Sequence, residues 1–219
     1  MAVLKDPHWE SVPSSLQKIF RYIGRQSFSA RFYLAGGTAL ALQLGHRLSV
    51  DLDFFSDHDE ITPASVKEIT TILQEEFSVS LVDAGLGGVL VGVEDSYVGF
   101  YHYSYPLLVP TIELEEVELA GLLDIGLMKM DAIAGRGGRK DFYDLYFIAQ
   151  QIPLEKMFAQ GAKKFPYIRQ FDMMVLAACV DFTIADEQAD VETTPPVMWE
   201  DVKAYFSDEA RRISRNWFE

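Results

Sequence analysis

The sequence predicts an α/β protein of the α+β kind, in which a strand-rich first half with a mixed sheet precedes an all-helical second half. Two observations carry this prediction. Between residues 31 and 105, strand patterns alternate with helical ones, whereas from about residue 119 the apolar residues recur only at helical spacing. The 219 residues have room for a core domain over 1–119 and a helical C-terminal region over 120–219.

Local signals mark the first elements. Ser14 and Ser15 can cap a helix that ends at Gly24, Gly45 stops a later helix, and Thr62-Pro63 begins another. The expected elements are a helix over 14–25, a strand over 31–35, a helix over 38–44, a strand over 50–55 and a helix from 62 to about 76.

Three strands follow, over 77–82, 89–93 and 97–105. The turn residues between them, Gly85 to Gly88 and Glu94 to Ser96, predict an antiparallel meander. After residue 119 the pattern predicts helices over 121–134 and 140–150, one from Pro153 and one over 168–180. A final helix carries its apolar face at Trp199, Val202, Phe206, Ala210, Ile213 and Trp217.

Composition narrows the class of protein. The chain is 49% hydrophobic and 24% charged, which is ordinary for a globular protein, and no apolar run has the length of a membrane span. The length of the apolar runs therefore predicts no membrane association, and the lone Cys179 excludes an internal disulfide and favours a reducing, cytoplasmic location. A net charge of −14 argues against an extended DNA-binding or RNA-binding surface.

Asp51 and Asp53 form a candidate metal pair. Side chains alternate along a strand, so both carboxylates share one face, with Leu52 and Phe54 on the other. Two carboxylates, with substrate phosphates and water, are the ligands Mg²⁺ takes in proteins. The alternative is a solvent-facing edge strand followed by an acidic turn.

Gly36, Gly37 and Thr38 form a candidate phosphate turn. Two glycines after a strand let a ligand approach the backbone, and the N-terminus of the following helix attracts anions. Thr38 is expected to cap this helix or donate to a phosphate oxygen. The turn lacks the Gly-Lys-Ser/Thr of a P-loop and the spacing of a Rossmann fingerprint, so a plain strand-to-helix turn stays the alternative.

Lys129 is a candidate anion-binding residue because it interrupts an otherwise apolar helix, where a lone ammonium needs a partner or a phosphate. The alternatives are extension to solvent or an ion pair with Asp124 or Asp131.

Lys140 and Asp141 begin the next predicted helix. In the simplest interpretation, Lys140 and Asp144 form a surface pair four residues apart, and Asp141 in the first turn favours the helix dipole.

These segments together resemble a known family. The Gly36-Gly37-Thr38 turn followed by residues 45–55 is similar to the first motif of the AbiEii/AbiGii nucleotidyltransferases, within the DNA polymerase β-like superfamily. Asp124 through Lys129 resembles that family's aspartate-to-lysine helix, and Arg136 through Leu145 resembles its closing motif. The resemblance runs in family order over more than half of the chain and implies a polymerase β-like core followed by a helical bundle.

The resemblance also implies roles. Gly36, Gly37 and Thr38 would hold the triphosphate of an NTP, and Asp51 and Asp53 would bind Mg²⁺ and align an attacking hydroxyl. The further implied residues are Ser49 and Lys129, which would contact phosphate or assist catalysis, and Lys140 and Asp141, which would complete the cleft from the helical region. The implied reaction moves an NMP from an NTP to a hydroxyl of RNA, a tRNA end or a protein. The implied context is a toxin–antitoxin or phage-defence system with a cognate antitoxin.

One departure from the superfamily pattern leaves a second hypothesis open. The usual third metal carboxylate comes from a neighbouring strand, but residues 97–104 contain no acid, and only Glu94 and Glu113 lie nearby in sequence. The alternative function is therefore a catalytically lapsed module that binds nucleotide or a protein partner.

Overall fold

The computed structural model describes residues 2–218 and divides into two compact units, Met1–Gly121 and Leu122–Glu219. The helices of the first unit are α1 (Ser14–Gly24), α2 (Gly36–Leu44) and α3 (Pro63–Leu73), with short 3₁₀ turns at Trp9–Ser11 and Ser29–Arg31. Its strands are β1 (Ala2–Val3), β2 (Tyr33–Ala35), β3 (Asp51–Ser56), β4 (Val79–Gly85), β5 (Gly88–Val93), β6 (Ser96–His102), β7 (Ile112–Leu114) and β8 (Val117–Leu119).

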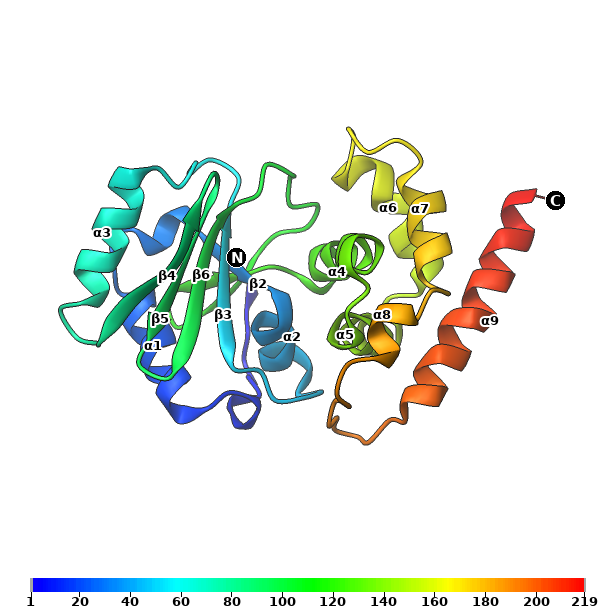
Figure 1. Cartoon of the computed structure of the whole chain (residues 1–219), viewed down its shortest axis with the longest axis horizontal. Helices are drawn as coiled ribbons and strands as arrows, with labels where there is room; N and C mark the ends of the chain where they lie inside the picture. Colours follow the sequence, from blue (N-terminus) through cyan, green and yellow to red (C-terminus); the bar gives the residue numbers. More distant parts are fainter. Residues whose placement is uncertain (1, 219) are drawn as a thin grey trace. The chain divides into compact units, whose positions relative to one another are not determined.

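All eight of these strands form one mixed sheet in the order β1-β7-β8-β2-β3-β6-β5-β4. The predicted meander is confirmed, because β4 pairs with β5 and β5 with β6, both antiparallel. At the centre of the sheet, β3 pairs with strands that are more distant in sequence: it is antiparallel to β2 and parallel to β6. Within this unit, Figure 1 shows α1 and α3 on one side of the sheet and α2 on the other.

One face of the sheet holds the core of the first unit. Phe54 of β3 lies beside Phe100 of β6 in register, and their rings stack with centroids 5.2 Å apart. The rings of Phe28 and Phe32 pack edge-on against Phe100 from the segment before β2. Because side chains alternate, this packing directs the other residues of β3 to the opposite face.

One strand of the first unit begins later than expected, and one hairpin was not predicted. The strand expected from residue 31 begins at Tyr33, because Ser29–Arg31 form a 3₁₀ turn. The β7–β8 hairpin was not predicted: its turn uses Glu115 and Glu116 at positive φ, where glycine or asparagine is the usual signal. Its strands have three residues each, too few for a recognisable alternation.

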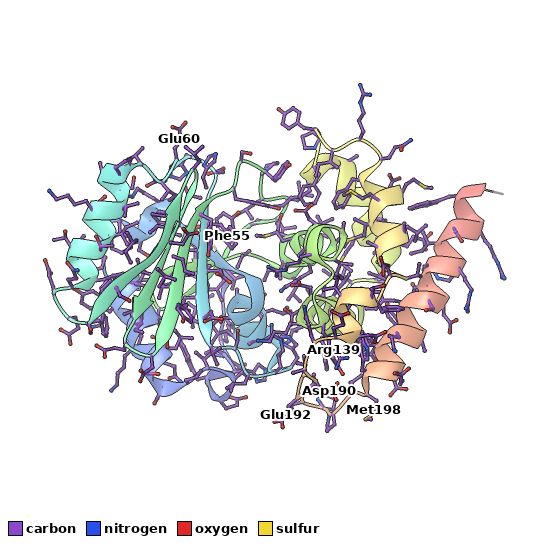
Figure 2. All side chains as sticks on the ribbon, in the orientation of Figure 1. Phe55, Glu60, Arg139, Asp190, Glu192 and Met198 are labelled. Atoms are coloured by element: carbon purple, nitrogen blue, oxygen red, sulfur yellow. The ribbon has the colours of Figure 1, made fainter. Side chains whose placement is uncertain are left out.

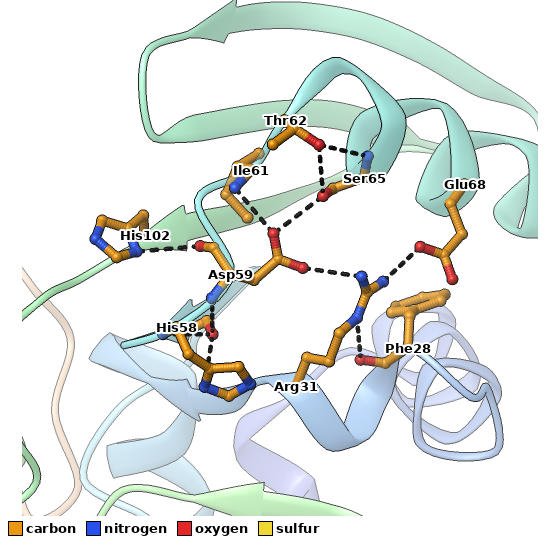
Figure 3. A network of polar contacts seen from close by, with 10 residues as sticks. Phe28, Arg31, His58, Asp59, Ile61, Thr62, Ser65, Glu68 and His102 are labelled. Carbon is orange, nitrogen blue, oxygen red and sulfur yellow. Dashed lines mark hydrogen bonds and ion pairs between the residues drawn. The ribbon is translucent and has the colours of Figure 1, made fainter.

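The loop after β3 is fixed by the buried carboxylate of Asp59 (Figure 3). This carboxylate accepts hydrogen bonds from the backbone N–H of Ile61 at 2.9 Å and the hydroxyl of Ser65 at 3.0 Å, and it pairs with Arg31 at 2.9 Å. Arg31 also pairs with Glu68 of α3 at 2.7 Å. The acidic turn after β3 is therefore a structural link between β3 and α3.

The described part of the second unit is helical. Its helices are α4 (Leu122–Arg136), α5 (Arg139–Ala149), α6 (Leu154–Lys164), α7 (Phe171–Ala178), α8 (Thr183–Asp186) and α9 (Trp199–Phe218). The predicted face of α9 is buried at Val202, Phe206 and Ile213, and the ring of Phe206 packs 5.3 Å from that of Phe142 on α5. Among the described residues, no helix combines the length and the apolar character that crossing a bilayer requires.

Candidate active site

The two aspartates of β3 lie on one half-buried face of an internal strand. Asp51 and Asp53 are partly exposed, whereas Leu52 and Phe54, which alternate with them along the strand, are fully buried. The predicted alternation is confirmed. The edge-strand alternative is wrong, because β3 has β2 on one side and β6 on the other.

The Gly36-Gly37 turn lies against these aspartates. Ala35 is paired with Asp53 in register, and the helix α2 begins at the next residue. Gly36 adopts a φ of +66°, which favours glycine, and a Cβ there would lie 3.1 Å from Asp53 Oδ2. The alanine at the N-cap has no side-chain oxygen to satisfy the first N–H groups of α2, so a bound anion can take that role.

The structure contradicts one of the two roles expected for Thr38. It lies in the first turn of α2 rather than at the cap, so the expectation that it caps the helix is wrong. Its buried hydroxyl donates to the main-chain carbonyl of Asp51, and its Oγ1 lies 2.8 Å from Ser49 Oγ. These bonds fix the start of β3 to the start of α2.

Arg47 is a residue of this site that the sequence analysis did not single out. It is buried, and its Nη1 donates to the carbonyl of Leu48 at 3.0 Å. A Cβ at Gly37 would lie 2.5 Å from Arg47 Nη2 and 3.1 Å from Ser49 Oγ. The guanidinium therefore rests against the glycine turn, beside the open N-terminus of α2, where it adds positive charge for a phosphate. The usable signal was an arginine between the glycine turn and the two aspartates of β3.

The neighbouring strand β6 carries no carboxylate beside Asp53. The residue beside Asp53 on the parallel strand β6 is Gly99. Glu94 is used elsewhere, since its carboxylate accepts a hydrogen bond from the Ser78 backbone at 2.8 Å, and Glu113 lies on β7, which is separated from β3 by β8 and β2. Among the described residues, no group of three or more His, Cys, Asp or Glu side chains is arranged to hold a metal ion.

The donor set still fits a divalent cation that arrives with a nucleotide. Asp51 and Asp53 offer carboxylate oxygens on one face, and Mg²⁺ commonly takes one or two carboxylates and completes its shell with substrate phosphates and water. The adjacent glycine turn and Arg47 are complementary to those phosphates.

Lys129 lies in a second charged cluster, within the helical unit. Its buried ammonium pairs with Asp141 at 2.8 Å and Asp144 at 2.7 Å, and Arg136 pairs with Asp141 at 2.8 Å. Burial opposes the charge on Lys129, but Asp144 and Asp141 outweigh it and raise the pKa of the ammonium. Burial likewise opposes ionisation of Asp141, yet Lys129 and Arg136 hold the pKa of that carboxyl below its usual range.

The partners of this cluster differ from the simple alternatives. Asp144 pairs with Lys129, not with Lys140 in a surface pair. Asp124, one of the two partners suggested for Lys129, pairs at 2.8 Å with Lys164, and both side chains are fully buried. Burial lowers the pKa of Lys164 against the opposing attraction of Asp124.

Lys140 is exposed near the start of α5 and lines a hollow of about 320 Å³. The wall on the other side comes from the segment after α8, which is held by Arg139. The backbone N–H of Arg139 donates to Gln188 at 2.8 Å, and its guanidinium pairs with Asp190 (Figure 2). The second cluster therefore brings together Lys129, Asp141 and Arg136, with Lys140 at its exposed edge.

A family model and a relative of similar length both match most of this chain. A family model described as "Nucleotidyl transferase AbiEii toxin, Type IV TA system" matches residues 18–213. The uncharacterised protein aq_aa25 of Aquifex aeolicus (strain VF5) is 31% identical over 188 residues, which are 84% of this chain and 89% of that protein.

Two solved structures have a similar fold at low sequence identity. A proposed nucleotidyltransferase from H. pylori has a TM-score of 0.52 at 15% identity and matches over 95% of this chain and 94% of that chain. ANT(2")-Ia, solved in complex with adenylyl-2"-tobramycin, has a TM-score of 0.52 at 13% identity over 71% of this chain and 100% of that chain. The predicted polymerase β-like fold is confirmed.

Proposed function

The chain belongs to the AbiEii nucleotidyltransferase toxin family, and from that premise we propose that it transfers an NMP from an NTP to an acceptor hydroxyl with Mg²⁺ at Asp51 and Asp53. Nucleotidyl transfer is the activity of the family. The metal, the residue roles and the acceptor are our proposal. The observation that carries it is the placement of both aspartates on one face of β3, directly beside the Gly36-Gly37 turn.

The first unit supplies the groups that this reaction needs. The N–H groups that begin α2 and the guanidinium of Arg47 bind the phosphates, while Asp51 and Asp53 hold the metal ion. The bound ion supplies neutralisation of phosphate charge. The acceptor oxygen forms a bond to the α-phosphorus as the bond to pyrophosphate breaks, and the acceptor proton leaves to solvent. Alignment and charge neutralisation carry most of the catalysis.

Residues of the helical unit are proposed for the same reaction on the basis of the family resemblance. Lys129 and Lys140 would contact phosphate, and Asp141 would hold Lys129 in place. The ion pair between Lys129 and Asp141 supports the last of these roles. Ser49, bonded to Thr38, would position the turn or contact phosphate.

The biological role that we propose follows the family description, which is that of a toxin in a Type IV toxin–antitoxin system. The protein partner would be a cognate antitoxin. The acceptor would be a hydroxyl of RNA, of a tRNA end or of a protein, and the protein would act in the cytoplasm.

Labelling with α-³²P-NTPs tests the chemistry. Purified protein with Mg²⁺ is incubated with each NTP and with RNA and protein acceptors, and label transfer is followed on gels. We expect transfer by the wild type and a loss of at least 100-fold in the double variant Asp51→Asn, Asp53→Asn, because the variant keeps the side-chain shape and removes the metal-binding charge.

The matched control is Asp57→Asn, the same substitution at an exposed carboxylate just after β3 that pairs with His58. This control should keep wild-type transfer, and all variants should keep the wild-type melting temperature. Labelling by the double variant equal to that by the wild type would contradict the assignment of Asp51 and Asp53 as metal ligands.

A further inference from the structure

Tyr101 lies on the same face of the sheet as the two aspartates and is not accounted for by the roles given above. The parallel pairing of β3 with β6 sets Asp53 beside Gly99 and Phe55 beside Tyr101. Directly paired residues in a sheet share a face, so Tyr101 projects from the face that carries Asp51 and Asp53. Its half-buried ring packs 5.5 Å from that of Phe55.

Two glycines form a seat for this ring. A Cβ at Gly88 of β5 would lie 2.9 Å from Tyr101 Cδ1, and a Cβ at Gly99 of β6 would collide with the far end of the ring, including the hydroxyl. The ring therefore lies flat on the sheet and points back along β6. Its hydroxyl ends over Gly99, the residue beside Asp53.

This placement puts a hydroxyl on β6, a strand beside β3 from which the family resemblance leads us to expect a third carboxylate. Gly99 offers no side chain of its own, and any side chain there would displace the phenol. A tyrosine phenol is protonated at neutral pH, because its ordinary pKa is about 10. A protonated phenol has one hydrogen to donate to a nearby carboxylate.

We propose that Tyr101 is a positioning residue that donates a hydrogen bond to Asp53 in the metal-loaded site and so takes the place of the third carboxylate. The inference rests on the proposed metal role of Asp53. Partners that hydrogen-bond a metal-ligating carboxylate orient it and keep its lone pairs on the ion, and their removal typically costs 10–100-fold in metal affinity. A neutral donor also leaves the site with two negative charges, which a single divalent ion balances.

A simpler role for the ring is to cover two glycines in the middle of the sheet. That role belongs to the aromatic ring alone, and the hydroxyl is irrelevant to it. The substitution Tyr101→Phe removes the hydroxyl and keeps the aromatic ring packed on Gly88 and Gly99, so it separates the two roles.

The test measures divalent-ion binding rather than turnover. Titration calorimetry with Mn²⁺ is carried out on the full chain saturated with a non-hydrolysable NTP analogue. We expect Tyr101→Phe to bind Mn²⁺ about 10- to 100-fold more weakly than the wild type, with an unchanged melting temperature and unchanged analogue binding in EDTA. The matched control is Tyr97→Phe, at a 52% exposed residue on the same strand face beside Asp51, and it should bind as the wild type does.

The outcomes separate this inference from the proposed function. Mn²⁺ binding by Tyr101→Phe within twofold of the wild type, alongside a strong loss in Asp53→Asn, overturns the role of Tyr101 and leaves the proposed metal site standing. An equal loss in Tyr97→Phe also overturns it, because the effect would then not be specific to the seated hydroxyl. Equal binding by Asp53→Asn and the wild type overturns the proposed metal site, and the role of Tyr101 with it.

Discussion

Gly37 lies where the backbone of α2 meets the guanidinium of Arg47, and this contact decides what a side chain at position 37 would do. Its φ, unlike that of Gly36, is not in the left-handed region, so the backbone itself accepts alanine. The obstacle is Arg47 Nη2, which would lie 2.5 Å from the new Cβ. The glycine is therefore needed for the position of the cation rather than for the shape of the turn.

We predict that Gly37→Ala weakens nucleotide binding with little loss of stability. The methyl group pushes Arg47 away from the phosphate turn, whereas alanine is a better helix former than glycine by about 1 kcal/mol. Calorimetry with a non-hydrolysable NTP analogue should show an affinity loss of about tenfold or more, or about 1.4 kcal/mol.

The control for this prediction is Gly135→Ala in α4, where a Cβ meets nothing within 4 Å. It should leave nucleotide affinity unchanged. Wild-type affinity in Gly37→Ala would mean that Arg47 does not act on the nucleotide from its observed position.

The sequence predicts some single residues of the site and misses others for identifiable reasons. The shared face of Asp51 and Asp53 follows from the two-residue period of a strand, which is a local property. Arg47 was missed because nothing local says that its guanidinium folds back on Gly37. Of the two roles expected for Thr38, the capping role is wrong because the helix begins two residues earlier than its sequence signal indicates.

At the scale of elements, α4 and α5 are joined by the buried pairs that Lys129 makes with Asp141 and Asp144. The two helices were predicted from their apolar period, and both were found within two residues of the expected bounds. The pairing between them was not predicted, because it depends on how the helices cross. An ion pair of Lys129 with Asp124 or Asp131 on its own helix was one alternative, but Lys129 pairs with Asp141 and Asp144 of α5.

We predict that Lys129→Met destabilises the protein at neutral pH by about 3 kcal/mol or more, since removing one partner of a buried ion pair leaves the others uncompensated. The matched control is Lys140→Met, at an exposed lysine near the start of the adjacent helix, which should change the free energy of unfolding by less than about 0.5 kcal/mol. Urea unfolding followed by circular dichroism measures both.

The pH dependence of that loss has a definite sign. The pKa of Asp141 is lowered in the folded state, so its contribution is fully present above the unfolded value of about 3.9 and is lost as pH falls through the folded pKa. The difference between the wild type and Lys129→Met should therefore shrink below about pH 4. A difference that stays constant down to pH 2.5 would show that the loss comes from packing of the lysine stem rather than from the ion pairs.

At the scale of the whole molecule, the division into a sheet unit and a helical unit lies at Gly121, close to where the hydrophobic period changes in the sequence. The strand order of the sheet could not be predicted in the same way. Strands β3 and β6 pair in parallel although α3, β4 and β5 lie between them in the sequence. The pattern of a single strand does not specify a partner so distant in sequence. That same pairing places Gly99 and Tyr101 beside the aspartates, so this part of the site emerges only with the fold.

The charge of the whole chain leads to the last prediction. With 33 acidic and 19 basic residues, the net charge is −14. Two arginines near the C-terminus are engaged in ion pairs: Arg211 pairs with Asp208 at 2.8 Å, and Arg212 pairs with Glu155 and Glu209 at 2.9 Å. We therefore expect weak binding of a generic single-stranded RNA, with few phosphate contacts.

Fluorescence anisotropy across a salt series measures this directly. Because each phosphate contact contributes about 0.7 to the slope of log K against log salt for single strands, we expect a slope smaller in magnitude than about 2. The triple variant Arg211→Ala, Arg212→Ala, Arg215→Ala should lower this slope further, because it removes three positive charges close together on α9. A slope of about 5 or more would require seven or so neutralised phosphates, and thus an extended basic surface that the net charge argues against. If the slope is as small as we expect, the protein selects its acceptor through contacts near the reacting hydroxyl rather than through long-range attraction to a polyanion.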